Sequence, residues 1–446
     1  MLYFAFVTHS LRKFWLPARF LPLSLLAFVM FVSGCTAQNF LIKAPTPGAS
    51  IASTPSATAQ SAQTKTELAQ TGVNRLLVLG EDGNLFTVNS DGKERIDLTT
   101  NAGSTHIYVQ PTWSPTGDSI GWGQLDRTSD TLASSVVTSR PDGSIQTQTD
   151  VPFPPFFLNW RPDGKQLAYL GNWVAAGEQT IALRLIDVAT GGTISSTLGV
   201  GQPFYFSWSP DGKQMLTHID NERTALLTMD GKETVLAAAS TNFATPQWAL
   251  DGDKLLYVLA KEGQSQLVIA DAAGAVQQEV TFVEGETVLN FSLSPKSDLL
   301  AYTETDQAVG LNSLGPLFLF NLANKKFQEL SADPVVAFFW SPDGHALLFL
   351  TPEIQGQELW INLHVWDGKA ARTLSRFMPS SVFLQQYLPF ADQYAQSTQL
   401  WSPDSSAVVF AGQDENAQTG VWVQPIDGKG SAQHVSDGVF ATWSPH

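Results

Sequence analysis

Short apolar runs recur along most of the chain. Residues 166–170, 255–258, 346–350 and 407–410 are four or five residues long, and apolar side chains occupy almost every position in them. A run of this length fits a β-strand, and the lack of polar alternation indicates a strand that is covered on both faces. The pattern therefore predicts many short, buried strands.

A recurring turn precedes each of these runs. The sequence Trp-Ser-Pro-Asp-Gly is typical of a turn in which Ser bonds the turn's own amides, Pro sets φ at the second position and Gly suits the fourth. Successive copies are 47, 48, 40, 45, 47, 61 and 42 residues apart, which is the period of a repeat architecture. These copies, intact or varied, are called Trp-motif turns and begin at Trp113, Trp160, Trp208, Trp248, Leu293, Trp340, Trp401 and Trp443.

A second kind of turn recurs between the copies. Tight hairpin sequences, most of them Asp-Gly, occur at residues 91–92, 142–143, 191–192, 230–231, 273–274, 324–325, 367–368 and 427–428. Each repeat thus predicts a strand ending in Trp, a turn, an apolar strand, a third strand, a hairpin and a fourth strand. Four short strands in a repeat of this length form one blade of a β-propeller.

The two kinds of turn are out of phase at the ends of the repeat region. The first hairpin, at residues 91–92, has no Trp-motif turn before it, and the last Trp-motif turn, at Trp443, has no hairpin after it. We therefore predict an all-β fold, a β-propeller of eight four-stranded blades, closed by pairing of the N- and C-terminal strands in one shared blade. Seven blades are the alternative, because the copy at Leu293 is degenerate. We expect the repeated tryptophans to pack between adjacent blades.

The Trp-Ser-Pro-Asp-Gly repeat resembles that of the TolB-type β-propeller family, over residues 73–446. The resemblance implies a propeller that makes contacts with proteins or ligands in the cell envelope. Some polysaccharide lyases also resemble this repeat family, and they place histidines across the central channel.

The first 34 residues have the features of an export signal. Arg12, Lys13 and Arg19 precede an apolar run at residues 20–32, which is too short to span a bilayer comfortably but fits a signal-peptide core. The run ends in Val32-Ser33-Gly34-Cys35, which resembles the bacterial lipobox. We therefore predict a lipoprotein signal peptide at residues 1–34 and lipid attachment at Cys35, the one cysteine of the chain. An uncleaved membrane anchor is the alternative.

Residues 35–72 are rich in Ala, Ser, Thr, Gln and Pro. Such a segment cannot bury enough apolar surface to offset the entropy lost on ordering. We predict a flexible tether at residues 35–72 and the propeller at residues 73–446.

Charge narrows the range of partners. The chain carries a net charge of −16, and without the first 34 residues 22 basic and 41 acidic residues remain, a net charge of −19. A surface this acidic repels phosphate backbones, so we expect no nucleic-acid partner.

Motifs for catalysis and metal binding are sparse. The chain has no His-Glu-x-x-His sequence, no P-loop and no pair of histidines at metal-ligand spacing. We therefore expect no catalytic residue, no metal and no cofactor. His218 and His364 lie in predicted strands, so either could face the central channel, although a hydrogen-bonded strand histidine is the more ordinary interpretation.

The longest step between copies, from Trp340 to Trp401, contains an insertion with helical spacing of aromatics. Phe383, Tyr387, Phe390 and Tyr394 follow one another at intervals of 4, 3 and 4 residues, and Pro389 suits a helix start or a kink. One hypothesis is an aromatic platform on the propeller rim that binds a partner. The alternative is a short helix whose aromatics pack onto a blade.

These observations favour a non-catalytic envelope lipoprotein, anchored to the membrane through Cys35. The propeller would act, as a monomer, as a scaffold that binds an envelope protein or polymer in the periplasm or on the cell surface. The alternative is a carbohydrate lyase or hydrolase with a site in the central channel.

Overall fold

The computed structural model describes residues 73–446 except 128–130, 176, 189, 238–244, 262–263, 281–286 and 306–313. All described residues belong to one compact unit. The predicted signal peptide, the tether and Cys35 lie outside the described residues. Within the described part of the chain, no helix is long and apolar enough to cross a membrane.

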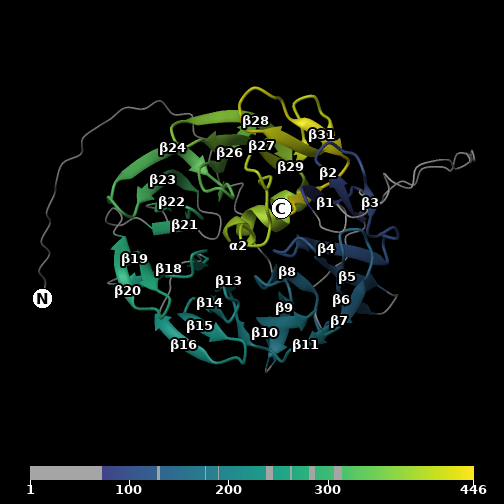
Figure 1. The fold of residues 1–446 in the computed structure, drawn as a ribbon, viewed down its shortest axis with the longest axis horizontal. Coiled ribbons are helices and arrows are strands. Elements are labelled where there is room, and N and C mark those ends of the chain that lie inside the picture. The colour runs from purple at the N-terminus through teal and green to yellow at the C-terminus, as the bar shows by residue number, and fades with distance from the viewer. Residues whose placement is uncertain are drawn as a thin grey trace, which may run out of the picture. The chain divides into compact units, whose positions relative to one another are not determined.

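The described residues form an all-β fold of antiparallel sheets. The sheets follow one another around a common centre, as the blades of a propeller do, and strands such as β4 (His106–Trp113) and β13 (Phe204–Trp208) lie nearer the centre than the later strands of their sheets (Figure 1). The short apolar runs form strands, as predicted: residues 166–170 lie in β9, 255–258 in β18 and 407–410 in β29.

Five sheets have four strands each. One joins β1 (Arg75–Leu79), β2 (Leu85–Asn89) and β3 (Ile96–Asp97) to β32 (Phe440–Trp443). The next consists of β4 (His106–Trp113), β5 (Ile120–Arg127), β6 (Leu132–Ser139) and β7 (Thr147–Asp150). The others are β13 (Phe204–Trp208), β14 (Gln214–Ile219), β15 (Arg223–Thr228) and β16 (Glu233–Ala237); β17 (Gln247–Trp248), β18 (Lys254–Lys261), β19 (Gln264–Asp271) and β20 (Val276–Val280); and β21 (Thr287–Leu293), β22 (Leu299–Thr305), β23 (Gly315–Asn321) and β24 (Phe327–Val335).

Two sheets are larger. The five-stranded sheet contains β8 (Pro155–Trp160), β9 (Gln166–Ala175), β10 (Glu178–Asp187), β11 (Thr193–Ile194) and β12 (Gly199–Gly201). The seven-stranded sheet contains β25 (Ala337–Trp340), β26 (Leu347–Gln355), β27 (Glu358–Trp366), β28 (Ala371–Pro379), β29 (Ala407–Gln413), β30 (Thr419–Pro425) and β31 (Gln433–Ser436). Outside the named strands, Trp401 forms an isolated bridge with Val408 of β29.

The Trp-motif turns have the hydrogen bonds that their sequence predicts. In the turn after Trp208, the Gly212 amide donates to the Ser209 carbonyl oxygen (2.8 Å). The Ser209 hydroxyl donates to the Asp211 carboxylate (2.8 Å) and accepts from the Gln214 amide (3.0 Å). Gly212 has a φ of +67°, which a side chain would strain. Each turn thus stabilises itself locally.

Three of the motif tryptophans bond to the preceding repeat, whereas the Trp248 indole N–H donates to the Gly252 carbonyl oxygen of its own turn (3.1 Å). The indole N–H of Trp113 donates to the Thr442 carbonyl oxygen (3.3 Å), that of Trp340 to Ser292 (2.9 Å) and that of Trp401 to Phe339 (3.0 Å). Each acceptor is the residue just before a Trp-motif turn: Ser292 precedes Leu293, Phe339 precedes Trp340 and Thr442 precedes Trp443. The Trp113 and Trp340 bonds run between sheets, in agreement with the predicted packing role, and the Trp401 bond joins two parts of the seven-stranded sheet.

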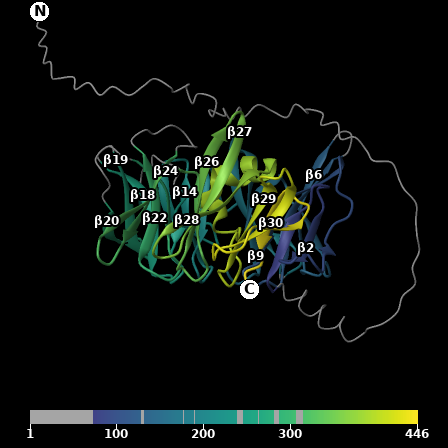
Figure 2. The ribbon, with the colours of Figure 1, turned by 90° about the horizontal axis from the view of Figure 1, so that it is seen from above.

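The ring has two different faces. Because each first strand ends at a Trp-motif turn and its neighbours are antiparallel, the Trp-motif turns and the hairpins between third and fourth strands lie on one face, called the turn face. The hairpins between second and third strands, and the connections between sheets, lie on the other, called the loop face. The C-terminus is on the turn face, and the β26–β27 hairpin projects from the loop face (Figure 2).

The two ends of the described region meet in one sheet. β1 pairs with β32 in antiparallel register from Leu76↔Trp443 to Leu79↔Phe440. The Ser444 amide donates to the Arg75 carbonyl oxygen (2.8 Å), and the Arg75 amide donates to the Ser444 hydroxyl (2.9 Å).

Candidate functional site

The insertion between Trp340 and Trp401 forms a chain of short helices after β28. It comprises η2 (Phe383–Tyr387), a π-helical turn, η3 (Leu388–Phe390), a 3₁₀ turn, and α2 (Ala391–Tyr394). Pro389 lies in the first turn of η3, where its missing N–H costs no hydrogen bond. The helical spacing of the aromatics was therefore a correct signal. Residues 380–398 are called the central segment.

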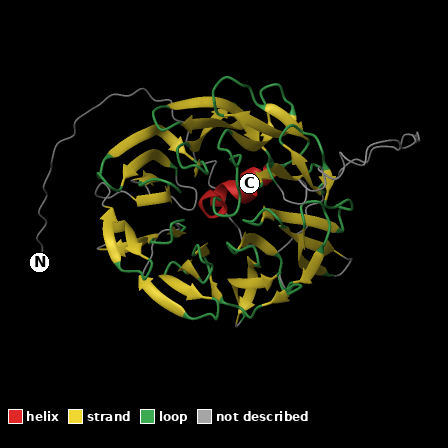
Figure 3. Cartoon of the chain, viewed as in Figure 1, coloured by secondary structure: helices red, strands yellow, loops and turns green. Residues whose placement is uncertain are grey.

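The central segment lies at the centre of the ring (Figure 3). The sequence hypothesis placed its aromatics on the rim, and the structure corrects that position. The connection between β28 and Trp401 turns inward from the loop face, and α2 contacts β21 and β25, the first strands of two sheets. An apolar helix gains more burial between several sheets than against the outer edge of one.

Hydrogen bonds hold the central segment to sheets on the far side of the ring. The Tyr394 hydroxyl donates to the Phe156 carbonyl oxygen in β8 (2.8 Å) and lies 2.9 Å from Gln110 Oε1 in β4. The Gln393 amide group donates to the Phe206 carbonyl oxygen in β13 (2.9 Å) and accepts from the Phe206 amide (3.1 Å). These partners come from three different sheets, so the segment ties them together.

The four aromatics of the insertion have different environments. Phe383, Tyr387 and Tyr394 are buried, whereas Phe390 is half-buried. The Tyr387 ring stacks on Phe440 of β32, with centroids 3.9 Å apart and planes at 14°. Their positions match the packing alternative, because a partner in solution cannot reach three of the four rings as they lie here.

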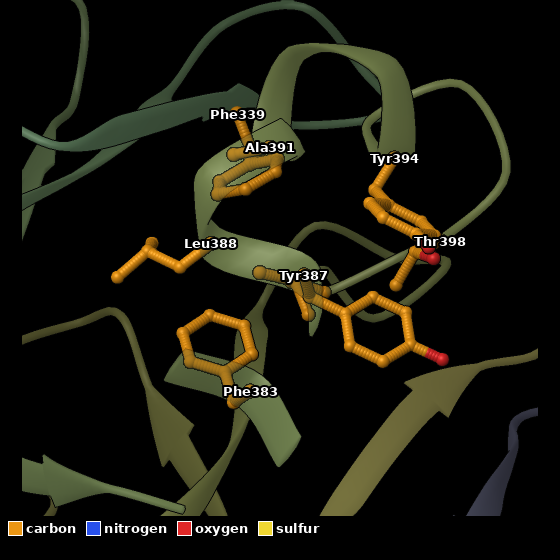
Figure 4. A pocket seen from close by; sticks show the side chains of 8 residues that line it. Phe339, Phe383, Tyr387, Leu388, Ala391, Tyr394 and Thr398 are labelled. Carbon is orange, nitrogen blue, oxygen red and sulfur yellow. The ribbon is translucent and has the colours of Figure 1, made fainter. Parts of the chain in front are cut away.

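A small hollow separates the central segment from its neighbours. It is lined by Phe339, Phe383, Tyr387, Leu388, Ala391, Tyr394, Thr398 and Leu400. Figure 4 shows the rings of Phe383, Tyr387 and Tyr394 around this space. Burial raises the pKa of Tyr387 and of Tyr394, so both hydroxyls stay protonated and neither serves as a base near neutral pH. The two tyrosines therefore supply no base in this apolar hollow.

Asp392 is the one carboxylate of the central segment. Its side chain is half-buried and accepts a hydrogen bond from the Thr245 amide (3.1 Å), next to β17. Burial raises the pKa of Asp392, and the Thr245 hydrogen bond opposes that shift. Burial, together with the Asp392 charge, also raises the pKa of Tyr205 in β13. An acidic group is thus held at the centre of the ring at an energetic cost.

The two strand histidines do not occupy first strands. His218 lies in β14, the second strand of its sheet, and its Nε2 is 2.8 Å from Asn221 Oδ1. His364 lies in β27, the third strand counted from β25, with hydroxyls of Thr351 at 2.8 Å and Thr373 at 3.0 Å. Burial lowers the pKa of both histidines. Both fit the interpretation as hydrogen-bonded strand histidines.

One match to a catalytic pattern lies within a Trp-motif turn. Gly117, Ser119 and Gly121 spell Gly-x-Ser-x-Gly, the sequence of a serine-hydrolase nucleophile elbow, which needs a strand–turn–helix setting. Here the turn leads from β4 into β5, and the Ser119 amide donates to the Ser114 hydroxyl (3.1 Å). Turn geometry accounts for this match. Across the described ranges, no three His, Cys, Asp or Glu side chains lie close enough together to hold a metal ion.

Sequence reasoning missed the polar partners of the central segment. Asp392 and Gln393 carry no motif, and Gln110 lies at an irregularity of β4 with a φ of +56°. Their roles depend on which sheets face the segment across the ring. The sequence signalled this region only through the unusual length of the step from Trp340 to Trp401, which contains the insertion.

No protein-family model and no curated protein sequence matches the chain. Among solved structures, a protein assigned as TolB from Agrobacterium tumefaciens is 17% identical, with 57% of this chain and 87% of that chain covered and a TM-score of 0.34. TolB from Acinetobacter baumannii is 14% identical, with 73% of this chain and 82% of that chain covered and a TM-score of 0.36. Oligogalacturonate lyase in complex with manganese is 14% identical, with 75% of this chain and 86% of that chain covered and a TM-score of 0.43. The chain is thus similar, at low identity, to TolB and other β-propeller proteins.

Proposed function

We propose that this chain is an exported lipoprotein, attached to the membrane through Cys35, whose propeller is a non-catalytic scaffold for an envelope protein or polymer. Residues 35–72 form the tether that holds the propeller away from the membrane. The propeller acts as a monomer and does not bind nucleic acid.

The filled centre of the ring carries this proposal. In a propeller, the centre is where side chains from many blades converge and where a substrate would be enclosed. In this chain, aromatic rings and the hydrogen bonds of Gln393 and Tyr394 occupy that position. Ligands are then left with the outer surface and the two faces of the ring, which suits binding of a large partner more than enclosure of a small substrate.

The same proposal includes a ring of eight blades closed at β1 and β32. The seven-stranded sheet contains two Trp-motif turns, at Trp340 and Trp401, so it counts as two blades joined through β28 and β29. The bridge between Trp401 and Val408 stands in the place of a first strand in the second of them. The pairing of β1 with β32 supports closure.

Cross-linking of the anchored chain in its own envelope, followed by purification, tests the scaffold function. We expect recovery of a protein, or of a polymer that is returned unchanged. Recovery of a polysaccharide that the purified chain shortens would contradict a non-catalytic role.

The anchor has a separate test. A Cys35→Ala variant should leave the membrane fraction, because the acyl chains would have no attachment atom. If the variant stays membrane-bound, residues 20–32 act as an uncleaved anchor and the lipoprotein proposal is wrong.

A further inference from the structure

One position of the repeat carries a charge in a single sheet. The residue nine places after the start of a Trp-motif turn lies in a second strand, and its ladder partner lies in the third strand. In six of the seven repeats that contain this position, the partner is apolar or a histidine: Val137, Ala225, Val268, Phe318, His364 and Trp422. In the seventh, the pair is Tyr169 of β9 and Arg184 of β10. Arg184 therefore departs from the pattern that the other repeats follow.

The Arg184 side chain has no anionic partner among the described residues. It makes no ion pair there, whereas Arg223 and Arg376 each pair with two carboxylates. Its Nε is buried without a hydrogen bond, although the residue as a whole is half-buried. Its guanidinium carbon lies 5.8 Å from the ring centre of Phe153 and 5.6 Å from that of Trp173. A guanidinium held among aromatic rings without an acceptor is costly unless something else supplies one.

The Tyr169 hydroxyl is a second donor without a partner. Tyr169 is 0% exposed, and its hydroxyl makes no hydrogen bond among the described residues. Burial raises the pKa of Tyr169, and the charge of Arg184 opposes that shift, so the hydroxyl lies within electrostatic range of the guanidinium and stays protonated at neutral pH. Buried polar groups normally have partners. Two neighbouring donors here lack an acceptor.

The side of β9 that carries these groups leads to the loop face. Residues two apart in a strand share a side, so Trp173 lies on the same side as Tyr169 and Arg184, nearer the β9–β10 hairpin. Trp173 is half-buried. Val136 of β6 packs in the same apolar cluster as Tyr169, and Leu132, on the same side of β6 at its loop-face end, is 48% exposed. Apolar residues of two sheets thus border the approach to Arg184.

We infer that Arg184 and Tyr169 bind a carboxylate of the scaffold's protein partner, an acidic side chain or a chain end, and that an apolar neighbour of this carboxylate covers Trp173 and Leu132. The carboxylate would accept hydrogen bonds from the guanidinium and the phenol, which supplies the acceptor that both donors lack. A charged anchor beside an aromatic ring is a common centre of a protein interface. The inference rests on the proposed scaffold function and specifies one contact of its partner.

Charge distinguishes this occupant from others. A guanidinium only donates hydrogen bonds, so it favours an anionic group over a neutral or basic one. A polymer with many carboxylates, or a second copy of the chain, would be repelled by the net charge of −16. A protein segment can offer one carboxylate among neutral or basic residues and avoids most of this repulsion.

Variants that restore the repeat pattern test the inference with a defined probe. The probe is the peptide acetyl-Leu-Glu-Leu-amide, and acetyl-Leu-Gln-Leu-amide is its uncharged counterpart. Arg184→Val, which introduces the residue found at positions 137 and 268, should weaken binding of the probe at least about tenfold. Tyr169→Phe should weaken it about fivefold. Neither variant should lower the melting temperature, because each removes a buried donor that has no partner in the free protein.

Two control variants separate this site from general effects. Tyr257→Phe changes the same repeat position in β18, and Arg140→Ala removes an exposed arginine, so both should leave binding unchanged. Equal binding of the two peptides, or no binding of either, would overturn the inference. So would a lower melting temperature of Tyr169→Phe with unchanged binding, which would show a purely structural role.

Site-specific photo-cross-linking in the native envelope separates this inference from the scaffold function. A photoreactive residue replaces Leu132 in the full anchored chain, and a matched variant carries it at Leu250, which is 71% exposed on the turn face. We expect a cross-link at position 132 to a protein segment that contains Asp, Glu or a chain end, its loss when Arg184→Val is added, and none at position 250. A protein cross-linked only at position 250, or at position 132 regardless of Arg184→Val, contradicts the inference and leaves the scaffold function standing. A polysaccharide at position 132 overturns the inference, and no protein at either position contradicts a protein scaffold.

Discussion

The same strands connect the two faces of the ring, but the turns of one face repeat and the connections of the other face vary. On the turn face, the same turn structure recurs. The hydrogen bond from the Ser hydroxyl to the Asp carboxylate in the turn after Trp208 is found again in the turns after Trp340 and Trp401. On the loop face, the described connections differ: the β9–β10, β18–β19 and β26–β27 hairpins extend beyond their neighbouring strands, and the central segment has no counterpart among the described connections. The turn face therefore repeats one local structure, whereas the loop face contains the connections that differ from blade to blade.

Charge follows the same division. Of the eleven lysines among the described residues, Lys261 ends a second strand, and the other ten lie in or beside turn-face turns: Lys93, Lys165, Lys213, Lys232, Lys254, Lys296, Lys325, Lys326, Lys369 and Lys429. The loop-face hairpins instead carry exposed carboxylates, at Glu81, Glu178, Glu222, Glu358 and Glu415. On the turn face, aspartates such as Asp91 and Asp211 pair with these lysines.

The largest effect expected from this comparison is at the central segment. Replacing Tyr387 by Ala should cost about 3–5 kcal/mol in the free energy of unfolding, because a buried aromatic ring is lost and leaves a cavity beside Phe440. Thermal denaturation followed by circular dichroism measures the loss. Gln385→Ala, an exposed position of the same helical turn, is the control and should be nearly neutral. An unchanged melting temperature for Tyr387→Ala would mean that the segment does not stabilise the ring.

The bonds between blades allow a matched pair of variants. Trp401→Phe removes the indole bond to the Phe339 carbonyl oxygen, whereas the buried Trp443 indole N–H has no hydrogen-bond partner among the described residues. Both substitutions remove a similar volume. We expect Trp401→Phe to cost about 1 kcal/mol more than Trp443→Phe, measured by urea unfolding. Equal losses would mean that ring packing alone joins the blades.

Asp392 should make the stability of the centre depend on pH. Burial raises the pKa of Asp392 in the folded protein above its unfolded value of about 4, so its ionised form lowers the free energy of unfolding at neutral pH. This cost is absent below the unfolded pKa and grows as pH rises through the folded pKa. Asp392→Asn should therefore raise the melting temperature at pH 7 and leave it unchanged near pH 3. Asp437→Asn, at a side chain that is 82% exposed, should change neither value.

The smallest effect is expected at the turn face. Hydrogen bonds from Lys213 and Ser209 lower the pKa of Asp211 to about 2, so its stabilising contribution is present above pH 4 and is lost as pH falls to about 2. Because the pair is exposed and screened by solvent, Asp211→Asn should cost only about 0.2–1 kcal/mol at pH 6. Denaturant unfolding of the two proteins should converge at pH 2. A difference that persists at pH 2 would point to turn geometry instead of charge.

Local patterns in the chain predicted much of this fold. The Ser209 turn, the buried strands after each turn and the bonds of Trp113, Trp340 and Trp401 between repeats follow from residues within one repeat or two adjacent ones. The aromatic spacing of the insertion correctly indicated helical turns, although it could not distinguish the rim from the centre. His218 and His364 illustrate the same limit, since strand membership alone does not tell which strand of a sheet they occupy.

What the amino-acid order settled by itself was therefore local: turns, strands, their repetition and the acidic balance of the chain. Only the tertiary structure decided that the central segment fills the ring, that Tyr394 reaches Phe156 and Gln393 reaches Phe206, and that the β26–β27 hairpin stands free. The physical reason is sequence separation. Turn bonds join residues a few positions apart, whereas the bonds of Gln393 and Tyr394 join residues 187 to 284 positions apart and depend on the curvature summed over several sheets. The Trp-motif repeat builds the ring, and one irregular insertion determines what its centre holds.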